Sequence, residues 1–259
     1  IAFTVNKQAI GRAQAVAEAI SPVLHDNFIP SHDRVLVAGD IAKVSIVGAG
    51  MIGRPGVAAQ MFRILADAGI NIQMISTSEI KISCVIAADD CDRAISALCQ
   101  KFEISTSVTE GIDPKQVAAP SVRGVALDLD RARLAILQVP DRPGMAAELF
   151  GILAANNISL DAIIQSQRTR VINGVATRDI ACTVAQGDAA DAKRVLEAAT
   201  TQLGCGAVVV DESIAKVSIV GAGMISNPGV AAQMFNCLAA AGINIQMIYT
   251  SEIKISCVV

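Results

Sequence analysis

Two long stretches of this chain repeat each other without a gap, and this repetition constrains the fold more than any other feature. Residues 42–86 and 215–259 align at an offset of 173 residues, with 38 of 45 positions identical. A weaker copy begins near Arg133, and the opening IAFTV matches the IACTV that begins at Ile180. A repeat of this length is typical of one supersecondary unit, so the chain contains parts of four related units.

The alignment also delimits the units and the segments between them. The first unit lacks its front and the fourth lacks its back, so we expect the chain to be a piece of a longer protein. Gly and Pro residues mark a linker before the third unit, and the strand-like GVALDL follows it. The expected divisions are 1–38 for the tail of the first unit, 39–104 for the second unit, 105–123 for the linker, 124–130 for the short strand, 131–210 for the third unit and 211–259 for the truncated fourth unit.

Each unit predicts the same order of strands and helices. KVSIVG alternates apolar and polar residues and is rich in β-branched ones, which favours a strand. Pro55-Gly56 then opens a helix with an apolar stripe, and Gly69 ends it. The remaining elements are strands over 70–74 and 80–86, a helix after Asp89-Asp90 and a last strand from Phe102. The order βαββαβ predicts an α+β fold of tandem ferredoxin-like units, with antiparallel sheets and helices on one face.

Composition excludes several classes of function. Lys and Arg number 21 against 24 Asp and Glu, and Trp is absent, so we expect no nucleic-acid partner. No apolar run is long enough to span a membrane, and the opening IAFTV turns polar at once, so we expect no signal peptide and a cytoplasmic protein. Two His residues and seven Cys residues without a CxxC pair provide no zinc ligands, so we expect reduced thiols and no metal.

GAGMIG at residues 48–53 has the letters of a dinucleotide-binding motif, but its context argues against that function. The other copy has Ser226 at the third Gly position. Pro55 also places the helix start after the last Gly, whereas the dinucleotide motif starts its helix within the glycines. We therefore expect no cofactor. Because no base or paired carboxylate is placed for catalysis, we also expect that the chain by itself is not an enzyme.

The turn between the first strand and first helix of a unit, GMIGRPG or VPDRPG, is the candidate ligand site. It presents free backbone N–H groups at a helix N-terminus, which suits a carboxylate. Asp141 in this turn, with Asp161 and Gln165 on the following strand, can bind an ammonium or amide group. An amino acid carries both charges and fits this turn. The sequence leaves an alternative open, in which Asp141 only caps the helix that begins at Pro143.

The text VPDRPGMAAELF…NISLDAIIQ, followed by VSIVGAGMISNPGVAAQMF…GINIQMIYTSEIKIS, resembles the C-terminal regulatory region of aspartate kinase, which is built of ACT domains. The resemblance covers nearly the whole chain, and TSEIKIS and GAGM…PGVAA are specific to that family among ACT proteins. Four units in tandem resemble the cyanobacterial form of the enzyme. The N-terminal catalytic domain of the family has no counterpart in this sequence, so ATP and magnesium are expected only for that domain.

In this family, paired ACT domains bind lysine and threonine at their shared interface and thereby inhibit the kinase. The resemblance therefore implies a feedback-regulatory region that senses lysine, threonine or both. It also assigns the strand at 124–130 to the fourth unit, because one ACT domain of each pair is inserted into the other. Exposed strand edges and the 53% apolar content predict a homodimer. The alternative is an interaction scaffold whose repeats only dimerise and whose ligand sites are degenerate.

The resemblance also implies a set of effector-binding residues. The third unit would contribute Asp141, Arg142, Pro143, Gly144, Met145, Ala146, Ala147, Asp161 and Gln165. The fourth unit would complete this site with Asn244, Ile245, Ser251 and Glu252. The equivalent residues of the first pair are Asn71, Ile72, Ser78 and Glu79, with the loop residues Met51, Gly53, Arg54, Gly56, Val57 and Ala58. Gln73 and Gln246 stand where lysine-specific relatives carry Asp, and Ala58 and Ala231 stand where some members carry Thr.

Overall fold

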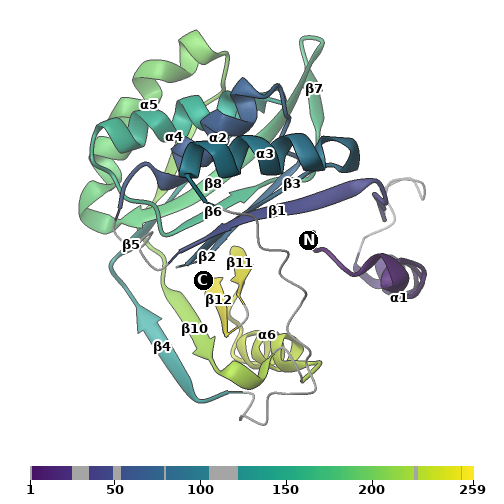
Figure 1. The fold of residues 1–259 in the computed structure, drawn as a ribbon. Coiled ribbons are helices and arrows are strands. Elements are labelled where there is room, and N and C mark those ends of the chain that lie inside the picture. Colours follow the sequence, from purple (N-terminus) through teal and green to yellow (C-terminus); the bar gives the residue numbers. More distant parts are fainter. Residues whose placement is uncertain are drawn as a thin grey trace.

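The chain folds into two antiparallel sheets, each covered by helices on one face (Figure 1). The structure is a computed structural model that describes residues 2–24, 35–48, 54–78, 80–104, 122–224, 227–251 and 253–259. The larger sheet has eight strands and the smaller has four. This arrangement confirms the predicted α+β fold of repeated ferredoxin-like units.

The second unit supplies three strands of the larger sheet. Its elements are β1 (Ile41–Val47), α2 (Val57–Asp67), β2 (Met74–Ser78), β3 (Lys81–Ala87), a 3-10 turn (Ala88–Asp90) and α3 (Cys91–Phe102). The predicted strand over 70–74 begins only at Met74, because the chain first closes the C-terminus of α2 through Gly69, whose φ is +68°. α3 continues to Phe102 and residues 103–104 are not in a strand, so the strand predicted from Phe102 does not start there, and its continuation lies outside the described residues.

The third unit is complete and adds a protruding hairpin. Its elements are β5 (Arg131–Pro140), α4 (Met145–Ala155), β6 (Ala162–Gln165), β7 (Arg170–Ile172), β8 (Val175–Ala185), a 3-10 turn (Gln186–Asp188), α5 (Ala189–Leu203) and β9 (Val208–Asp211). The β7–β8 hairpin extends away from the sheet (Figure 1). β5 bulges between Ile136 and Val139 and then pairs again through Pro140 with Thr177, which fixes the start of the loop that follows.

The fourth unit forms the smaller sheet. Its elements are β4 (Gly124–Asp128), β10 (Lys216–Val220), a 3-10 turn (Ala222–Met224), α6 (Val230–Ala240), β11 (Met247–Thr250) and β12 (Lys254–Val258). The strand β4, which precedes the third unit in the chain, pairs antiparallel with β10, with Gly124 opposite Val220 and Asp128 opposite Lys216. The strand expected at GVALDL therefore lies in the sheet of the fourth unit.

The N-terminal segment contains a 3-10 turn (Lys7–Ala9) and the helix α1 (Ile10–Leu24). Residues 2–6, whose letters match part of β8, do not form a strand. No described strand pairs with them, and a β-strand is stable only beside a partner.

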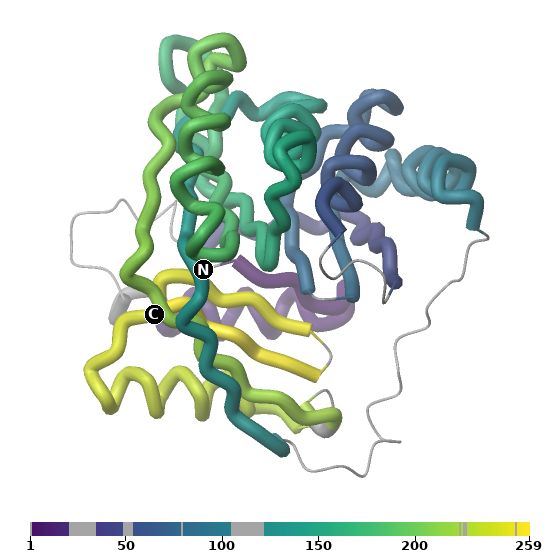
Figure 2. Tube along the Cα trace, turned by 90° about the vertical axis from the view of Figure 1, so that its left-hand side faces the viewer, coloured from purple at the N-terminus to yellow at the C-terminus, as the bar shows by residue number. Residues whose placement is uncertain are grey.

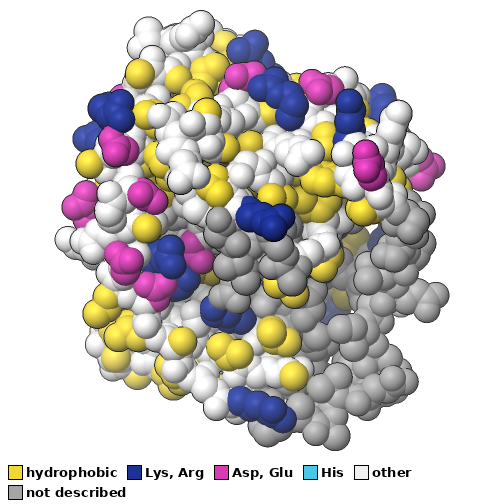
Figure 3. Space-filling view, turned by 60° about the vertical axis from the view of Figure 1, so that its left-hand side comes forward, with side chains coloured by type: hydrophobic (Ala, Val, Ile, Leu, Met, Phe, Trp, Pro, Cys, Tyr) yellow, Lys and Arg dark blue, Asp and Glu magenta, His cyan; other side chains and the backbone are white. Residues whose placement is uncertain are grey.

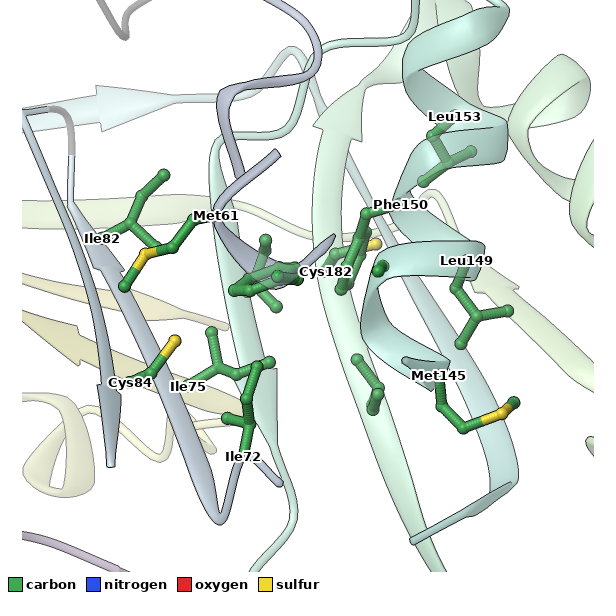
Figure 4. Close-up of a cluster of buried hydrophobic side chains, with 14 of the residues drawn as sticks. Met61, Ile72, Ile75, Ile82, Cys84, Met145, Leu149, Phe150, Leu153 and Cys182 are labelled. Atoms are coloured by element: carbon green, nitrogen blue, oxygen red, sulfur yellow. The ribbon is translucent and has the colours of Figure 1, made fainter. Parts of the chain in front are cut away.

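The second and third units share one sheet and one core. The strand order is β1-β3-β2-β6-β8-β5-β9, with Ser76 of β2 opposite Ile164 of β6. Above this junction, Phe62 of α2 and Phe150 of α4 place their ring centroids 5.7 Å apart. Figure 4 shows side chains of both units meeting in a single apolar cluster. Burial of this joint core binds the two units to each other.

The sequence predicted that the third unit shares its ligand interface with the fourth unit, and this prediction is wrong for the helix-covered side of the larger sheet. The third unit pairs edge to edge with the second unit instead. The second and fourth units are nearly identical, but they differ at the position that pairs with Ile164 of β6. The second unit has Ser76 there, and the fourth has Tyr249 at the corresponding position. A small residue at this crossing leaves room for the neighbouring strand, which favours the second unit as the partner.

The fourth unit instead packs against the reverse face of the larger sheet, on the side opposite α2, α3, α4 and α5 (Figure 2). Ile214, Met247 and Val258 of the fourth unit form a buried cluster with Ile164 of β6 and Ala181 of β8. The molecule is thus layered, with helices, the larger sheet, the smaller sheet and α6 in succession.

Candidate functional site

A pocket lies between the second and third units, beside the N-terminus of α4. The third unit contributes the turn from Val139 to Ala147, with Gln165 of β6 and Arg178 of β8. The second unit contributes Phe62 of α2 and the segment 70–72 before β2. The pocket has a cavity volume of about 20 Å³, which is room for about one water molecule. An amino acid is larger than this space, so it would bind either partly in the open mouth of the pocket or with lining residues moved apart.

The carboxylate of Asp141 is the centre of the polar contacts in this pocket. Asn71 of the second unit donates its side-chain N–H to Asp141 Oδ1 at 3.1 Å. Arg178 forms an ion pair with Asp141, with 3.0 Å between Nε and Oδ2, and only 15% and 12% of the two side chains are exposed. Arg178 Nη1 also donates to the carbonyl oxygen of Gln73 at 2.7 Å. Asp141 is therefore held from both units.

The N-terminus of α4 has no side-chain cap. The cap position is Gly144, whose φ of 95° lies in the left-handed region that glycine adopts without strain. The carboxylate of Asp141 does not cap the helix and bonds to Asn71 and Arg178 instead. The interpretation of Asp141 as a helix cap is therefore wrong. Residues of the first turn of α4 line the pocket, and the N-terminus of a helix carries a partial positive charge that favours an anion.

The remaining walls combine one amide with several apolar side chains. Gln165 is buried, and its side-chain N–H lies 3.5 Å from the carbonyl oxygen of Ile72. Ile72 and Met145 lie at the same end of the apolar cluster drawn in Figure 4. The apolar lining residues are Phe62, Ile70, Ile72, Val139, Met145 and Ile180. The pocket thus combines a helix start, one carboxylate, one amide and an apolar lining.

Most of the predicted residues of the third unit line this pocket, and one does not. Those in the lining are Asp141, Arg142, Pro143, Gly144, Met145, Ala146, Ala147 and Gln165. Asp161 lies elsewhere, because its carboxylate bonds to Lys216 and Tyr249 of the fourth unit. Its predicted place in the pocket is therefore wrong.

The predicted residues of the other units are divided in the same way. Asn71 and Ile72 of the second unit occupy the place that was expected for Asn244 and Ile245 of the fourth. Asn244, Ile245 and Ser251 do not line the pocket. Met51, Gly53, Glu79 and Glu252 lie outside the described residues.

The other predicted residues of the second unit lie away from the pocket. Gly56 is the uncapped start of α2, with a φ of 100°, and a methyl group at its Cα would meet Ala154 of α4 at 3.6 Å. Arg54, Val57 and Ala58 flank this helix start. The hydroxyl of Ser78 is buried at the end of β2 and has no hydrogen-bond partner among the described residues.

Arg178 is a site residue that the sequence reasoning missed, although a pattern in the sequence marks it. Along β8 the residues Ile180, Cys182 and Val184 are buried and share one face. Arg178 continues that face with a charge at the end of an otherwise apolar row. A charged residue in such a row indicates a buried partner, here Asp141.

The described residues contain no group of three or more His, Cys, Asp and Glu side chains placed to hold a metal ion. The expectation of no metal and no cofactor stays a prediction. Among the described helices, none combines the length and the apolar character that a bilayer crossing requires.

Comparison with known proteins bears on this site and fold. ACT-domain sequence profiles match residues 44–102 and 217–259, and a second ACT-domain profile matches 133–200. The aspartate kinase of Pseudomonas fluorescens is 42% identical over 147 residues, which are 57% of this chain and 34% of that protein. The aspartokinase of Thermus thermophilus is 40% identical over 158 residues, which are 60% of this chain and 38% of that protein. The chain thus spans little more than a third of the length of these relatives.

Solved structures agree with this comparison. The crystal structure of aspartate kinase from Synechocystis has 53% identity and a TM-score of 0.90, covering 98% of this chain and 43% of that one. The regulatory subunit of aspartate kinase from Thermus thermophilus is 42% identical, and the match covers 54% of this chain and 88% of that one, with a TM-score of 0.48. The fold and the matched domains define a protein of tandem ACT domains. The chain belongs to the ACT-domain family, and its sequence is similar to the matched region of the aspartate kinases named above.

Proposed function

We propose that this chain is the effector-sensing region of an aspartate kinase and that it binds threonine in the pocket between the second and third units. The observation that carries the proposal is the uncapped start of α4 beside the carboxylate of Asp141. The helix N-terminus favours the carboxylate of an amino acid, and Asp141 favours its ammonium group. In the complete enzyme, binding would lower phosphotransfer to aspartate.

The lining of the pocket favours threonine over lysine, the other effector that the resemblance implies. Among the described residues that line the pocket, Asp141 is the only acidic one, and it would bind the α-ammonium group. A lysine ligand needs a second carboxylate for its side chain, and Asp161 is bound to the fourth unit instead. A threonine hydroxyl needs only a neutral partner such as Gln165. The small cavity also has to widen less for threonine.

The position of the pocket explains how binding could regulate a kinase. Asn71 comes from the second unit and the start of α4 from the third, so a ligand between them contacts both units. A ligand shifts a conformational equilibrium by its difference in affinity for the two states. Threonine would therefore stabilise one arrangement of the two units.

Isothermal calorimetry on two matched variants tests this proposal. Asn71→Ala removes a pocket side chain, whereas Asn244→Ala removes its counterpart in the fourth unit, which is exposed. Loss of a hydrogen bond near a charged group corresponds to roughly 10–100-fold weaker threonine binding for Asn71→Ala. We expect no change for Asn244→Ala, and weaker or absent heat with lysine.

Two results would contradict the proposal. If Asn244→Ala weakens binding and Asn71→Ala does not, the pocket is formed by the third and fourth units, as the sequence reasoning expected. If neither threonine nor lysine produces heat with the parent chain, the dimerisation scaffold with degenerate ligand sites replaces the sensor.

Association into a homodimer and a cytoplasmic location belong to the same proposal. Val125, Leu127 and Leu129 of the β4 region are between 62% and 72% exposed, an apolar row that suits an interface. In the face drawn in Figure 3, hydrophobic side chains stand among separate acidic and basic groups. Sedimentation as a 26.8 kDa monomer at micromolar concentration would contradict the dimer.

A further inference from the structure

A buried ion cluster joins the third and fourth units on the face of the larger sheet opposite the pocket. Asp161, at the bend before β6, accepts hydrogen bonds at Oδ2 from Lys216 Nζ at 2.8 Å and from Tyr249 Oη at 3.2 Å. The Thr183 hydroxyl donates to the same oxygen at 3.4 Å. Lys216 is also 3.4 Å from Asp128 Oδ2. One carboxylate of the third unit thus receives two side chains of the fourth.

The burial of this cluster makes it sensitive to any separation of the two sheets. The side chain of Lys216 is 8% exposed and that of Asp161 is 15% exposed. Apolar side chains surround them, including Met247 and Val258 from the fourth unit and Ile164 from β6. Removal of one partner of a charge in such surroundings is destabilising, although Lys216 keeps Asp128 and Asp161 keeps Tyr249 and Thr183 as further partners.

The contacts are specific to this pair of units. Asp161 has Gln73 and Gln246 as its counterparts in the second and fourth units, so only the third unit presents a carboxylate at this position. Tyr249 has Ser76 as its counterpart in the second unit. The repeat therefore contains two copies of the lysine, Lys43 and Lys216, but one complete cluster.

The same strands form both the pocket and the surface on which the fourth unit rests. Asp161 immediately precedes β6, and Gln165 at its end lines the pocket. Ile163 N donates to the hydroxyl of Thr77 on β2 at 2.9 Å, so β2 and β6 are tied together. On the other side of β6, Ile164 packs against the fourth unit. A shift of β6 against β2 would therefore change the pocket on one face of the sheet and the contact with the fourth unit on the other.

We infer that the fourth unit responds to occupancy of the pocket through the contact of Asp161 with Lys216 and Tyr249. The inference rests on the proposed function, because it needs a ligand that moves the second and third units apart as it enters the pocket. That separation moves β2 against β6, and β6 carries Asp161 with it. Ligand binding and docking of the fourth unit then share a coupling free energy, and each alters the other by the same factor. Asp161 is a positioning residue in this scheme, since it does not touch the ligand.

Tyrosine fluorescence measures this coupling directly, because Tyr249 is the only Tyr and Trp is absent. Titration of the parent chain with threonine should change the Tyr249 emission, with the same midpoint as calorimetry. Asp161→Asn keeps the size of the side chain and removes its charge, and Lys216→Met removes the partner. Both should abolish the emission response and change the threonine affinity at least fivefold, within the usual range of coupling. Lys43→Met, at the exposed counterpart on β1, should behave like the parent.

The outcomes separate this inference from the proposed function. Threonine heat without any change of Tyr249 emission in the parent would refute the coupling and leave the sensor intact. An affinity within twofold of the parent in Asp161→Asn, with unchanged circular dichroism, would refute it as well. Absence of threonine and lysine heat from the parent chain would overturn both proposals together.

Discussion

Charge removal at the Asp141–Arg178 pair tests the polar centre of the pocket without altering its shape. Asp141→Asn keeps the oxygen that accepts from Asn71, and Arg178→Met keeps most of the apolar stem of the arginine. Opposite charges about 4 Å apart attract by about 4 kcal/mol at an effective dielectric constant of about 20. Desolvation offsets part of this, and hydrogen bonds to charged groups contribute about 1.5–3 kcal/mol net. We expect a coupling of about 2 kcal/mol.

A double-mutant cycle isolates this coupling from the other effects of the two substitutions. In Asp141→Asn the guanidinium keeps two partners, the carbonyl oxygen of Gln73 and the hydroxyl of Thr169, so the single variant should lose about 2 kcal/mol rather than the full penalty of an unpaired ion. For a chain of this size, that loss lowers the melting temperature by about 4–8 °C. Thermal unfolding followed by circular dichroism measures both quantities.

The Arg63–Glu148 pair provides a matched control, because it also joins the second and third units. Its atoms are 2.8 Å apart, but the two side chains are 50% and 45% exposed. Exposed pairs of this kind contribute about 0.2–1 kcal/mol, and salt screens them. A coupling for Asp141–Arg178 no larger than this control, or one that vanishes equally at high salt, would refute the assignment of a buried, ligand-organising ion pair.

Three further predictions concern the backbone, the tyrosine and the thiols. Gly144→Ala should destabilise the chain by about 1–3 kcal/mol because of its φ of 95°, whereas Gly151→Ala inside α4 should stabilise it by about 1 kcal/mol; urea midpoints that move in the same direction would contradict this. Burial, aided by the carboxylate of Asp161, raises the pKa of Tyr249 above its ordinary value of 10.0. The stabilisation that the neutral phenol contributes is therefore fully present below pH 10 and is lost as the pH rises further. A titration of the folded protein, followed by tyrosine absorbance, that is centred near pH 10 would contradict this. Cys237 is exposed and should react first with thiol reagents, whereas burial raises the pKa of Cys182 to about 12 and should protect it until unfolding, so simultaneous labelling would argue against the packing described.

The repetition in the sequence predicted the architecture of each unit well, because local patterns determine local structure. The alternation in KVSIVG became β1 and β10, and the PG turns became the starts of α2, α4 and α6. The separate strand expected at GVALDL pairs with β10. The limits of the units, the cofactor expectation and the oligomeric state stay predictions.

The sequence could not show which units pair, since the repetition itself makes the choice ambiguous. Asn71 and Asn244 stand in the same AGINIQMI text, so motif matching assigns either of them to the pocket. The choice depends on positions where the copies differ, such as Ser76 and Tyr249, and on packing across a sheet junction. The hydrophobic pattern of one unit does not show which other unit its surface fits.

The role of Asp161 was missed for a related reason. Its position after the turn matched that of a predicted ligand-binding residue. Its carboxylate accepts a hydrogen bond from Lys216 of the fourth unit instead, 55 residues later in the chain. Arg178 was overlooked because it belongs to the β7–β8 hairpin, which the other units lack. The contact of Asp161 with the fourth unit is revealed only by the three-dimensional arrangement, whereas the charge of Arg178 in the apolar row of β8 could have been noticed in the sequence.

The identical text of β1 and β10 has a consequence for the kinetics of folding. AKVSIVGAG occurs at 42–50 and again at 215–223, and β4 pairs with the second of these edges. Among the described strands β1 has β3 as its one partner, so its other edge offers β4 the same register, with Lys43 in the place of Lys216. A refolding chain therefore meets two acceptor edges that are equivalent in sequence, and a chain at high concentration meets those of its neighbours as well. We expect a slow refolding phase in which β4 exchanges between these edges. The amplitude of this phase should grow with protein concentration.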